Sequence, residues 1–193
     1  MSLSTQQQIL DGARQCFFQH GYKASNMSLF SEYAGFSRVT IHKYFKNKDL
    51  VFRAVCNEYQ SKCHQACLPI IDAQLDCWEA IALVMDVWSK SVFEEVNDSL
   101  IYKDLHYYAQ QVAADIFLDA HVNLESVLCK IINNGVGQRQ LDLQKMNLSD
   151  HQFASILVSS LNGINSNTKP ELIRETTEQT LNIFRLASEP VKS

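Results

Sequence analysis

The chain has 193 residues, 46% of them hydrophobic, and this length is enough to bury a core without disulfide or metal cross-links. Its six glycines and three prolines are too few for the frequent turns of an all-β protein, so long helices are expected. No stretch approaches the roughly 20 apolar residues of a membrane span, and the N-terminus lacks a signal-peptide pattern. The sequence therefore predicts a cytoplasmic, all-α protein.

Charge is distributed unevenly along the chain. The formal net charge is −4, yet residues 1–53 hold seven basic and three acidic side chains, a local balance of +4. The remaining residues therefore sum to −8. This asymmetry favours a small module that faces DNA phosphates, attached to an acidic body that does not.

Two helices are predicted at the N-terminus, the second of them short. Apolar residues within 9–17 recur at helical spacing, and Gly21 is typical of a left-handed residue that ends a helix. Either Ser25 or Asn26 can cap a second helix, which is expected to end at Gly35.

A third helix follows after a turn of only three residues. Ser37 is a suitable N-cap for a helix from Arg38 to about Phe45, and Ile41 and Phe45 lie four residues apart, so both can pack inward. The short turn between two helices predicts a helix-turn-helix. The open side of the third helix then carries side chains that can read the DNA major groove or contact phosphates, namely Arg38, Val39, Thr40, His42, Lys43 and Tyr44.

The next helix begins with the run Lys46-Asn47-Lys48-Asp49, in which Asn47 is the predicted cap. A helix N-terminus flanked by lysines attracts phosphate. Over residues 9–55 the sequence resembles the DNA-binding signature of TetR-family regulators. The resemblance is carried by Gly21-Tyr22, Ser25, Met27, Phe30, Ala34-Gly35-Phe36-Ser37, Thr40-Ile41, Tyr44-Phe45, Asn47-Lys48-Asp49 and Phe52-Arg53-Ala54-Val55.

This resemblance implies a division of roles among the exposed residues. The residues implied to contact the DNA backbone are Thr40, Tyr44 and Lys48, and we add Ser25 to this set. The residues implied to face base edges are Arg38, Val39 and Lys43, and His42 on the same face joins them. Val39 stands where the family commonly has Gly, and His42 where it usually has Tyr, so the operator sequence cannot be inferred from relatives.

We expect a DNA-binding domain in residues 1–47 and a helical ligand-binding and dimerisation domain in residues 48–193. In the second domain the pattern predicts a helix from Lys48 to about Cys67, ended by Pro69. A helix with an apolar stripe from Trp78 follows, with a break at Asn97-Asp98.

Beyond that break we expect a shorter segment through Tyr102 and Leu105, and then a long helix from about Tyr107 to Asn134. Two further helices are predicted from capping-box patterns. Ser149-Asp150-His151-Gln152 opens one of them, and Thr168-Lys169-Pro170-Glu171 opens the last.

The resemblance also implies a homodimer, in which the last two helices of each protomer form a four-helix bundle. The apolar residues expected at this interface are Ile156, Leu157, Leu161, Leu181 and Phe184. Aromatic and polar residues on the helices that enclose a ligand cavity in the family are candidates for a small apolar or aromatic effector. They are Trp78, Met85, Trp88, Tyr102, His106, Tyr107, Phe117 and His121.

An alternative hypothesis comes from the cysteines. Cys56, Cys63 and Cys67 recur on one predicted helix beside His64, a set that could serve a small helical metal- or redox-sensing protein. A tetrahedral metal site needs a ligand from a second segment, and no such segment is identifiable, so we predict no metal. No catalytic or cofactor motif occurs, and we expect neither an enzyme nor a cofactor. The favoured reading is a ligand-responsive repressor that binds a palindromic operator as a dimer.

Overall fold

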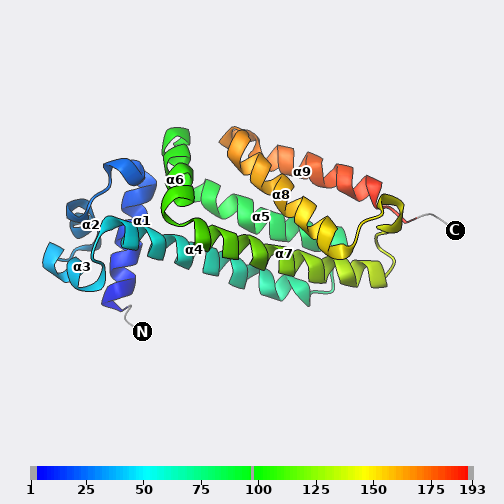
Figure 1. The fold of residues 1–193 in the computed structure, drawn as a ribbon, viewed down its shortest axis with the longest axis horizontal. Coiled ribbons are helices and arrows are strands. Elements are labelled where there is room, and N and C mark those ends of the chain that lie inside the picture. Colours follow the sequence, from blue (N-terminus) through cyan, green and yellow to red (C-terminus); the bar gives the residue numbers. More distant parts are fainter. Residues whose placement is uncertain (1–3, 97, 191–193) are drawn as a thin grey trace. The chain divides into compact units, whose positions relative to one another are not determined.

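A computed structural model describes residues 4–96 and 98–190, and the described part of the chain is helical. Its helices are α1 (Thr5–Ala24), α2 (Met27–Ala34), α3 (Arg38–Tyr44), α4 (Lys48–Ile71), α5 (Cys77–Glu95), α6 (Ser99–Val112), α7 (Ala114–Gly137), the short 3-10 helix η1 (Gln144–Met146), α8 (Asp150–Asn167) and α9 (Pro170–Ala187) (Figure 1). None of the described helices combines the length and apolar character needed to cross a membrane. The expected all-α fold is confirmed.

The chain divides into two compact units. Unit 1 contains residues 1–61 and 95–118, and unit 2 contains residues 62–94 and 119–193. Unit 1 therefore extends past residue 47, and it includes all of α6. The division at residue 47 stays a prediction about function, since compactness alone does not assign roles.

The core of unit 1 is aromatic. The Phe17 ring lies 5.0 Å from the Phe30 ring and 4.9 Å from the Phe52 ring, measured between centroids. Ile9, Ala13 and Ile41 are fully buried around them. Aromatic pairs at these separations add specific orientation to apolar burial, and this core holds α1, α2, α3 and the start of α4 together.

A close helix crossing joins α1 to α2. A Cβ atom on Gly12 would lie 2.7 Å from both the Cα and the backbone nitrogen of Ala34, closer than real Cβ atoms approach. The backbones can approach this closely only because Gly12 has no side chain. Gly12 thus sets the distance between the two helices.

The cap residues agree with the sequence analysis at several helix starts. The Asn26 side chain accepts hydrogen bonds from the amides of Ser28 and Leu29, so Asn26, and not Ser25, caps α2. Ser149 and Gln152 form the expected reciprocal capping box of α8.

The capping box expected at Thr168 is wrong. Lys169 is the N-cap of α9 without a side-chain bond, because Thr168 closes α8 and Pro170 already occupies the first turn.

Two predicted helix boundaries are also wrong. Pro69 lies inside α4, but the helix continues only to Ile71, so the proline disturbs no more than the last turn. The break expected before Tyr107 lies instead at Ala113, which joins α6 to α7 with non-helical φ and ψ angles. Of the predicted break at Asn97-Asp98, Asn97 lies outside the described residues and Asp98 caps α6.

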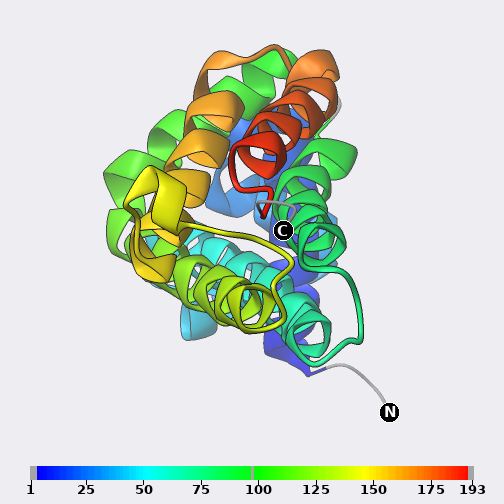
Figure 2. The same cartoon turned by 90° about the vertical axis from the view of Figure 1, so that its right-hand side faces the viewer.

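Unit 2 has an aliphatic core with a small aromatic cluster. The Phe153 ring of α8 lies 6.2 Å from the Trp78 ring of α5 and 5.7 Å from the Phe184 ring of α9. Figures 1 and 2 show α8 and α9 side by side and antiparallel, as the two-residue connection between them requires. Leu128 and Leu157 are fully buried in this unit.

Replacing Gly12 by alanine tests the close crossing of α1 and α2. The added methyl group meets backbone atoms, which cannot turn aside, so we expect Gly12→Ala to lower the free energy of unfolding by about 1–3 kcal/mol. Urea denaturation measures the loss. Gly137→Ala is the matched control, because a Cβ there meets nothing within 4 Å, and its effect should stay within about 0.5 kcal/mol. Equal stability of the two variants would show that the helices do not need this approach.

Candidate functional site

The exposed face of α3 is the candidate nucleic-acid surface. The Ser37 hydroxyl accepts a hydrogen bond from the Thr40 amide at 3.1 Å and starts the helix. Ile41 is fully buried and Phe45 is 6% exposed, so these two residues anchor α3 on the core as expected. The opposite face is open to solvent and carries Arg38, Val39, His42, Lys43 and Tyr44. Val39 is 69% exposed, so its methyl groups are accessible from the solvent side of α3.

The turn that leads into α3 is fixed by local hydrogen bonds. Gly35 adopts a left-handed conformation after α2, and its amide donates to the Ser31 carbonyl at 3.1 Å. The Ser31 hydroxyl donates to the Phe36 carbonyl. These two hydrogen bonds stabilise the turn that connects α2 to α3.

The N-terminus of α4 lies in the same unit and carries Lys48. The Asn47 side chain accepts a hydrogen bond from the Leu50 amide at 2.9 Å, which confirms Asn47 as the cap. The Lys48 ammonium donates to the Tyr22 carbonyl at 2.9 Å and lies 4.1 Å from the centre of the Tyr22 ring. These contacts fix the position of the cation and leave it further N–H groups for a phosphate.

Tyr22 contacts neighbouring groups through its backbone, its ring and its hydroxyl. Its hydroxyl donates to the Asp49 carboxylate at 2.5 Å, and its ring stacks on the Tyr108 ring of α6 at 4.1 Å. Burial raises the pKa of Tyr22, and the hydrogen bond to Asp49 raises it further, so the phenol keeps its proton. The side chain that holds Lys48 is itself held by α4 and α6.

The Gly21 turn attaches α6 to α1. The Asp104 carboxylate accepts hydrogen bonds from the Tyr22 amide at 2.6 Å and the Lys23 amide at 3.1 Å. Gly21 has φ 74° and ψ 177°, outside the left-handed helical region that the sequence suggested, and a Cβ there would lie 2.6 Å from an Asp104 oxygen. Both the angles and the close carboxylate require glycine.

Arg53 joins α4 to the break between α6 and α7. Its guanidinium donates to the Val112 carbonyl at 2.8 Å and to both Asp115 oxygens at 2.7 and 2.6 Å. The carbonyl lies at the end of α6 and the carboxylate in the first turn of α7, so one side chain serves both helix ends. The hydrogen bonds from Arg53 lower the pKa of Asp115 to about 2. Arg53 contributes to the positive charge of residues 1–53, but its guanidinium binds Val112 and Asp115 of the same chain.

Two of the residues assigned to the DNA backbone have internal partners. Ser25 is 1% exposed, and its hydroxyl donates to the Gly21 carbonyl at 2.5 Å, because the chain between α1 and α2 turns its side chain inward. The Thr40 hydroxyl lies 2.9 Å from that of Ser37. Tyr44 is 46% exposed and open to a ligand. The hydroxyl of Ser25 has no free path to a phosphate in this structure.

The eight predicted effector-pocket residues are distributed over both units. In unit 2, Trp78 and Met85 are buried in the core, and Trp88 is 9% exposed. His121 is half-buried on α7, and burial lowers its pKa. In unit 1, Tyr102 stacks on His106 with centroids 6.1 Å apart, and Phe117 packs against the aromatic core. Tyr107 is 58% exposed, because the break at Ala113 places it on the outer face of α6.

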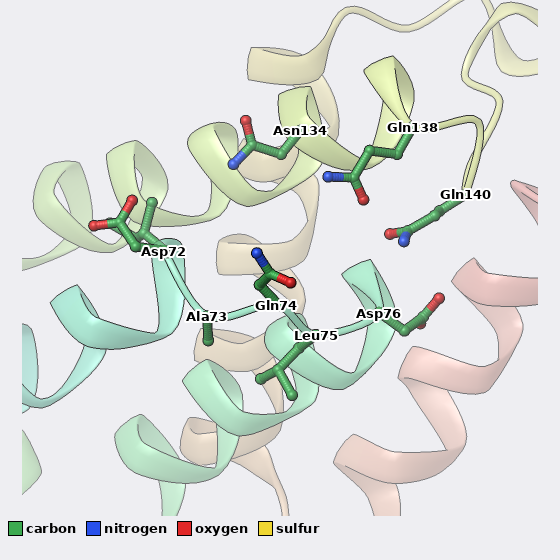
Figure 3. Close-up of a pocket in the computed structure, with 9 residues that line it drawn as sticks. Asp72, Ala73, Gln74, Leu75, Asp76, Asn134, Gln138 and Gln140 are labelled. Atoms are coloured by element: carbon green, nitrogen blue, oxygen red, sulfur yellow. The ribbon is translucent and has the colours of Figure 1, made fainter.

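Unit 2 contains a pocket that the sequence analysis missed. It has a volume of about 610 Å³ and lies between the connection from α4 to α5 and the end of α7 (Figure 3). Its walls are mostly polar and comprise Ile71, Asp72, Ala73, Gln74, Leu75, Asp76, Asn134, Gln138 and Gln140. Two of these side chains have structural roles, since Asp76 accepts from the Trp78 amide and Gln140 from the Cys77 amide. None of the expected effector residues lines it.

The cysteines do not form a reactive cluster. Cys63 and Cys67 are buried on α4, and burial raises the pKa of Cys67 to about 11 and that of Cys56 to about 12. Thiols with these pKa values carry little thiolate at neutral pH, so they are poor nucleophiles and ligands. Among the described residues, no three His, Cys, Asp or Glu side chains lie together as a metal site would require.

The candidate dimer residues divide into buried and exposed sets. Leu157 and Leu161 are 0% and 1% exposed within one protomer, because α8 turns them toward the core of unit 2. Leu181 is likewise buried, Phe184 is half-buried, and Ile156 is 37% exposed. The outer face of α9 instead exposes Leu172, Ile183 and Leu186, which the sequence analysis did not select.

Residues 9–55 match the model of bacterial regulatory proteins of the tetR family. The HTH-type transcriptional repressor AcnR of Corynebacterium efficiens is 38% identical over 56 residues, which cover 29% of this chain and 30% of that protein. The uncharacterized HTH-type transcriptional regulator YhgD of Bacillus subtilis is 30% identical over 90 residues, which cover 45% of this chain and 47% of that protein. The chain thus matches less than half the length of these relatives.

Solved structures are similar over nearly the whole chain. SmeT, the repressor of the Stenotrophomonas maltophilia multidrug efflux pump SmeDEF, aligns with a TM-score of 0.71 at 19% identity, covering 96% of this chain and 90% of that one. A SmeT-triclosan complex aligns with a TM-score of 0.73 at 17% identity, covering 98% and 93%. At such low identity these likenesses show the fold alone. Residues 9–55 are therefore similar to bacterial regulatory proteins of the tetR family, and the described part of the chain has the same overall fold as SmeT.

Proposed function

We propose that this protein is a transcriptional repressor that inserts α3 into the major groove of operator DNA. The observation that carries the proposal is the solvent-open face of α3 within the matched domain, where Arg38, Val39, His42 and Lys43 are exposed while Ile41 is buried. An arginine can pair bidentately with guanine, and an exposed valine can contact a thymine methyl group. Tyr44 and Lys48 supply backbone contacts beside them.

The repressor acts as a homodimer on a palindromic operator. A two-fold symmetric dimer presents its two α3 helices in related orientations and so binds two symmetric half-sites. The dimer forms through α8 and α9, where Ile156, Leu172, Ile183 and Leu186 are exposed apolar residues on the outer faces. Exposed apolar groups on neighbouring helices favour association with a second copy.

A small apolar or aromatic molecule bound in the helical C-terminal region releases the DNA. The fold likeness to SmeT, solved with triclosan, supports control by a small molecule. A ligand shifts the equilibrium only as far as its affinities for the DNA-bound and free conformations differ. The competing hypothesis of metal or redox sensing by Cys56, Cys63, Cys67 and His64 has less support, because burial raises the pKa of Cys56 and of Cys67 and keeps these two thiols protonated.

Lys48 tests the backbone contacts. Lys48→Ala should weaken specific and non-specific DNA binding alike and reduce the slope of log K against log salt by about one per protomer, because one fewer counterion is released. Fluorescence anisotropy across a salt series measures both effects. Lys103→Ala on α6 is the matched control, since it removes the same charge from an exposed site outside the helix-turn-helix. A Lys48 variant with the control's slope would refute the contact.

Arg38 tests base reading. Arg38→Ala should cost about 1–3 kcal/mol on the cognate operator and relax the preference at one base pair per half-site. Arg38→Lys keeps the charge and loses the bidentate geometry, so it should retain non-specific affinity and lose the same preference. Competition binding against single-base operator variants gives the profile. A preference unchanged in both variants would limit Arg38 to phosphate contact.

The outer face of α9 tests the dimer. Charged residues cannot be buried without a partner, so Ile183→Lys combined with Leu186→Lys should convert the dimer to a monomer at micromolar concentration. Light scattering measures the mass. Leu83→Lys is the control, since Leu83 is an exposed leucine of α5, outside the proposed interface. A stable dimer in the double variant would place the interface elsewhere.

A further inference from the structure

The peptide group that links Tyr22 to Lys23 lies between two opposite charges. Its N–H, which belongs to Lys23, donates to the Asp104 carboxylate of α6 at 3.1 Å. Its C=O, which belongs to Tyr22, accepts a hydrogen bond from the Lys48 ammonium of α4 at 2.9 Å. A trans peptide directs its N–H and its C=O to opposite sides. A carboxylate and an ammonium therefore bind the two ends of one peptide dipole.

This arrangement strengthens both hydrogen bonds. A carboxylate that accepts from the peptide N–H leaves the carbonyl oxygen of the same peptide more negative, because linked hydrogen bonds polarise one another. The Lys48 ammonium therefore meets a better acceptor than an isolated carbonyl. Hydrogen bonds in which one partner is charged are also stronger than neutral ones. Asp104 thus acts on Lys48 through one peptide group.

The turn at Gly21 depends on Asp104 for its hydrogen bonds. Gly21 has φ 74° and ψ 177°, so the helical hydrogen-bond pattern of α1 is interrupted there. The amides of Tyr22 and Lys23 follow this interruption, and the same Asp104 oxygen, Oδ2, accepts from both of them. On the other side, the buried Ser25 hydroxyl donates to the Gly21 carbonyl. Asp104 therefore fixes a turn that glycine by itself leaves conformationally free.

We propose that Asp104 is a positioning residue for DNA binding, which orders the peptide between Tyr22 and Lys23 and so holds Lys48 for contact with a phosphate. This role rests on the proposed function and adds to it a determinant of affinity outside the helix-turn-helix. Asp104 is negatively charged, and a negative charge by itself repels DNA. Its removal would strengthen DNA binding through charge alone, and it weakens DNA binding through lost positioning. The two effects have opposite signs.

Asp104→Asn removes the charge and changes little volume. We expect this variant to bind the operator about 5-fold more weakly, the usual effect of one lost hydrogen bond, as measured by fluorescence anisotropy. Asp119→Asn is the matched control, because it makes the same change at an exposed aspartate of α7, and its operator affinity should not fall. Operator binding by Asp104→Asn that equals or exceeds that of the native protein would overturn the proposal.

A double-mutant cycle shows whether Asp104 acts through Lys48. In a Lys48→Ala background, Asp104→Asn should change operator affinity by less than about 2-fold, because the group that it positions is gone. The preference among single-base operator variants should stay that of the native protein, since Lys48 contacts phosphate and not base edges. Equal losses in both backgrounds, or an altered base preference, would show a general effect on the helix-turn-helix and overturn the proposal.

Chemical labelling tests the position of Lys48 without DNA. Acetic anhydride acetylates accessible lysine amines, and mass spectrometry gives the rate at each lysine. Lys48 should react more slowly than the exposed Lys43 and Lys46, and Asp104→Asn should accelerate Lys48 alone, by about 5-fold. Where Asp104→Asn does not fold, Asp104→Glu keeps the charge, displaces the carboxylate by one methylene group and should accelerate Lys48 in the same way. Equal rates at the three lysines of the native protein, or an unchanged rate at Lys48 in the folded variant, would overturn the proposal.

The two measurements separate this role from the proposed function. Faster acetylation of Lys48 in Asp104→Asn with unchanged operator affinity contradicts the positioning role, while operator binding by the native protein still supports the repressor proposal. Failure of the native protein to bind any operator contradicts the repressor proposal. The acetylation rates then decide alone whether Asp104 holds Lys48.

Discussion

The contacts of Tyr22 hold unit 1 together. Its amide donates to Asp104 of α6, its carbonyl accepts from Lys48, and its hydroxyl donates to Asp49. Its ring stacks on Tyr108 and meets the edge of Phe52. One residue therefore joins three helices, and the cation proposed to bind phosphate is fixed by the same residue that fixes α6.

This arrangement makes α6 part of the compact unit that carries α3. Asp104 attaches it to the Gly21 turn, and Arg53 holds both sides of the break at Ala113. Charged groups that satisfy backbone atoms at helix ends are stronger than neutral caps, because a full charge meets the partial charges of the helix end. A change in α6 would therefore act on the backbone of unit 1 and not only on its surface.

Unit 2 has a core of buried apolar side chains. Leu128, Leu157 and Phe153 are fully buried and supply stability. The Trp88 indole lies in the same interior, where burial raises the pKa of the Cys67 thiol and a hydrogen bond with Trp88 lowers it.

The sequence alone determined the helix-turn-helix and its open face. Those features depend on residues within one turn of each other, such as the cap at Ser37, the buried pair Ile41 and Phe45, and Gly35 after α2. Tertiary structure decided the break at Ala113, because a run of helix-forming residues hides it and Arg53, 59 residues from Val112, stabilises it. It also decided which leucines of α8 face inward. Helical periodicity shows which residues of a helix share one face. Only packing against helices distant in the sequence decides whether that face is buried or exposed.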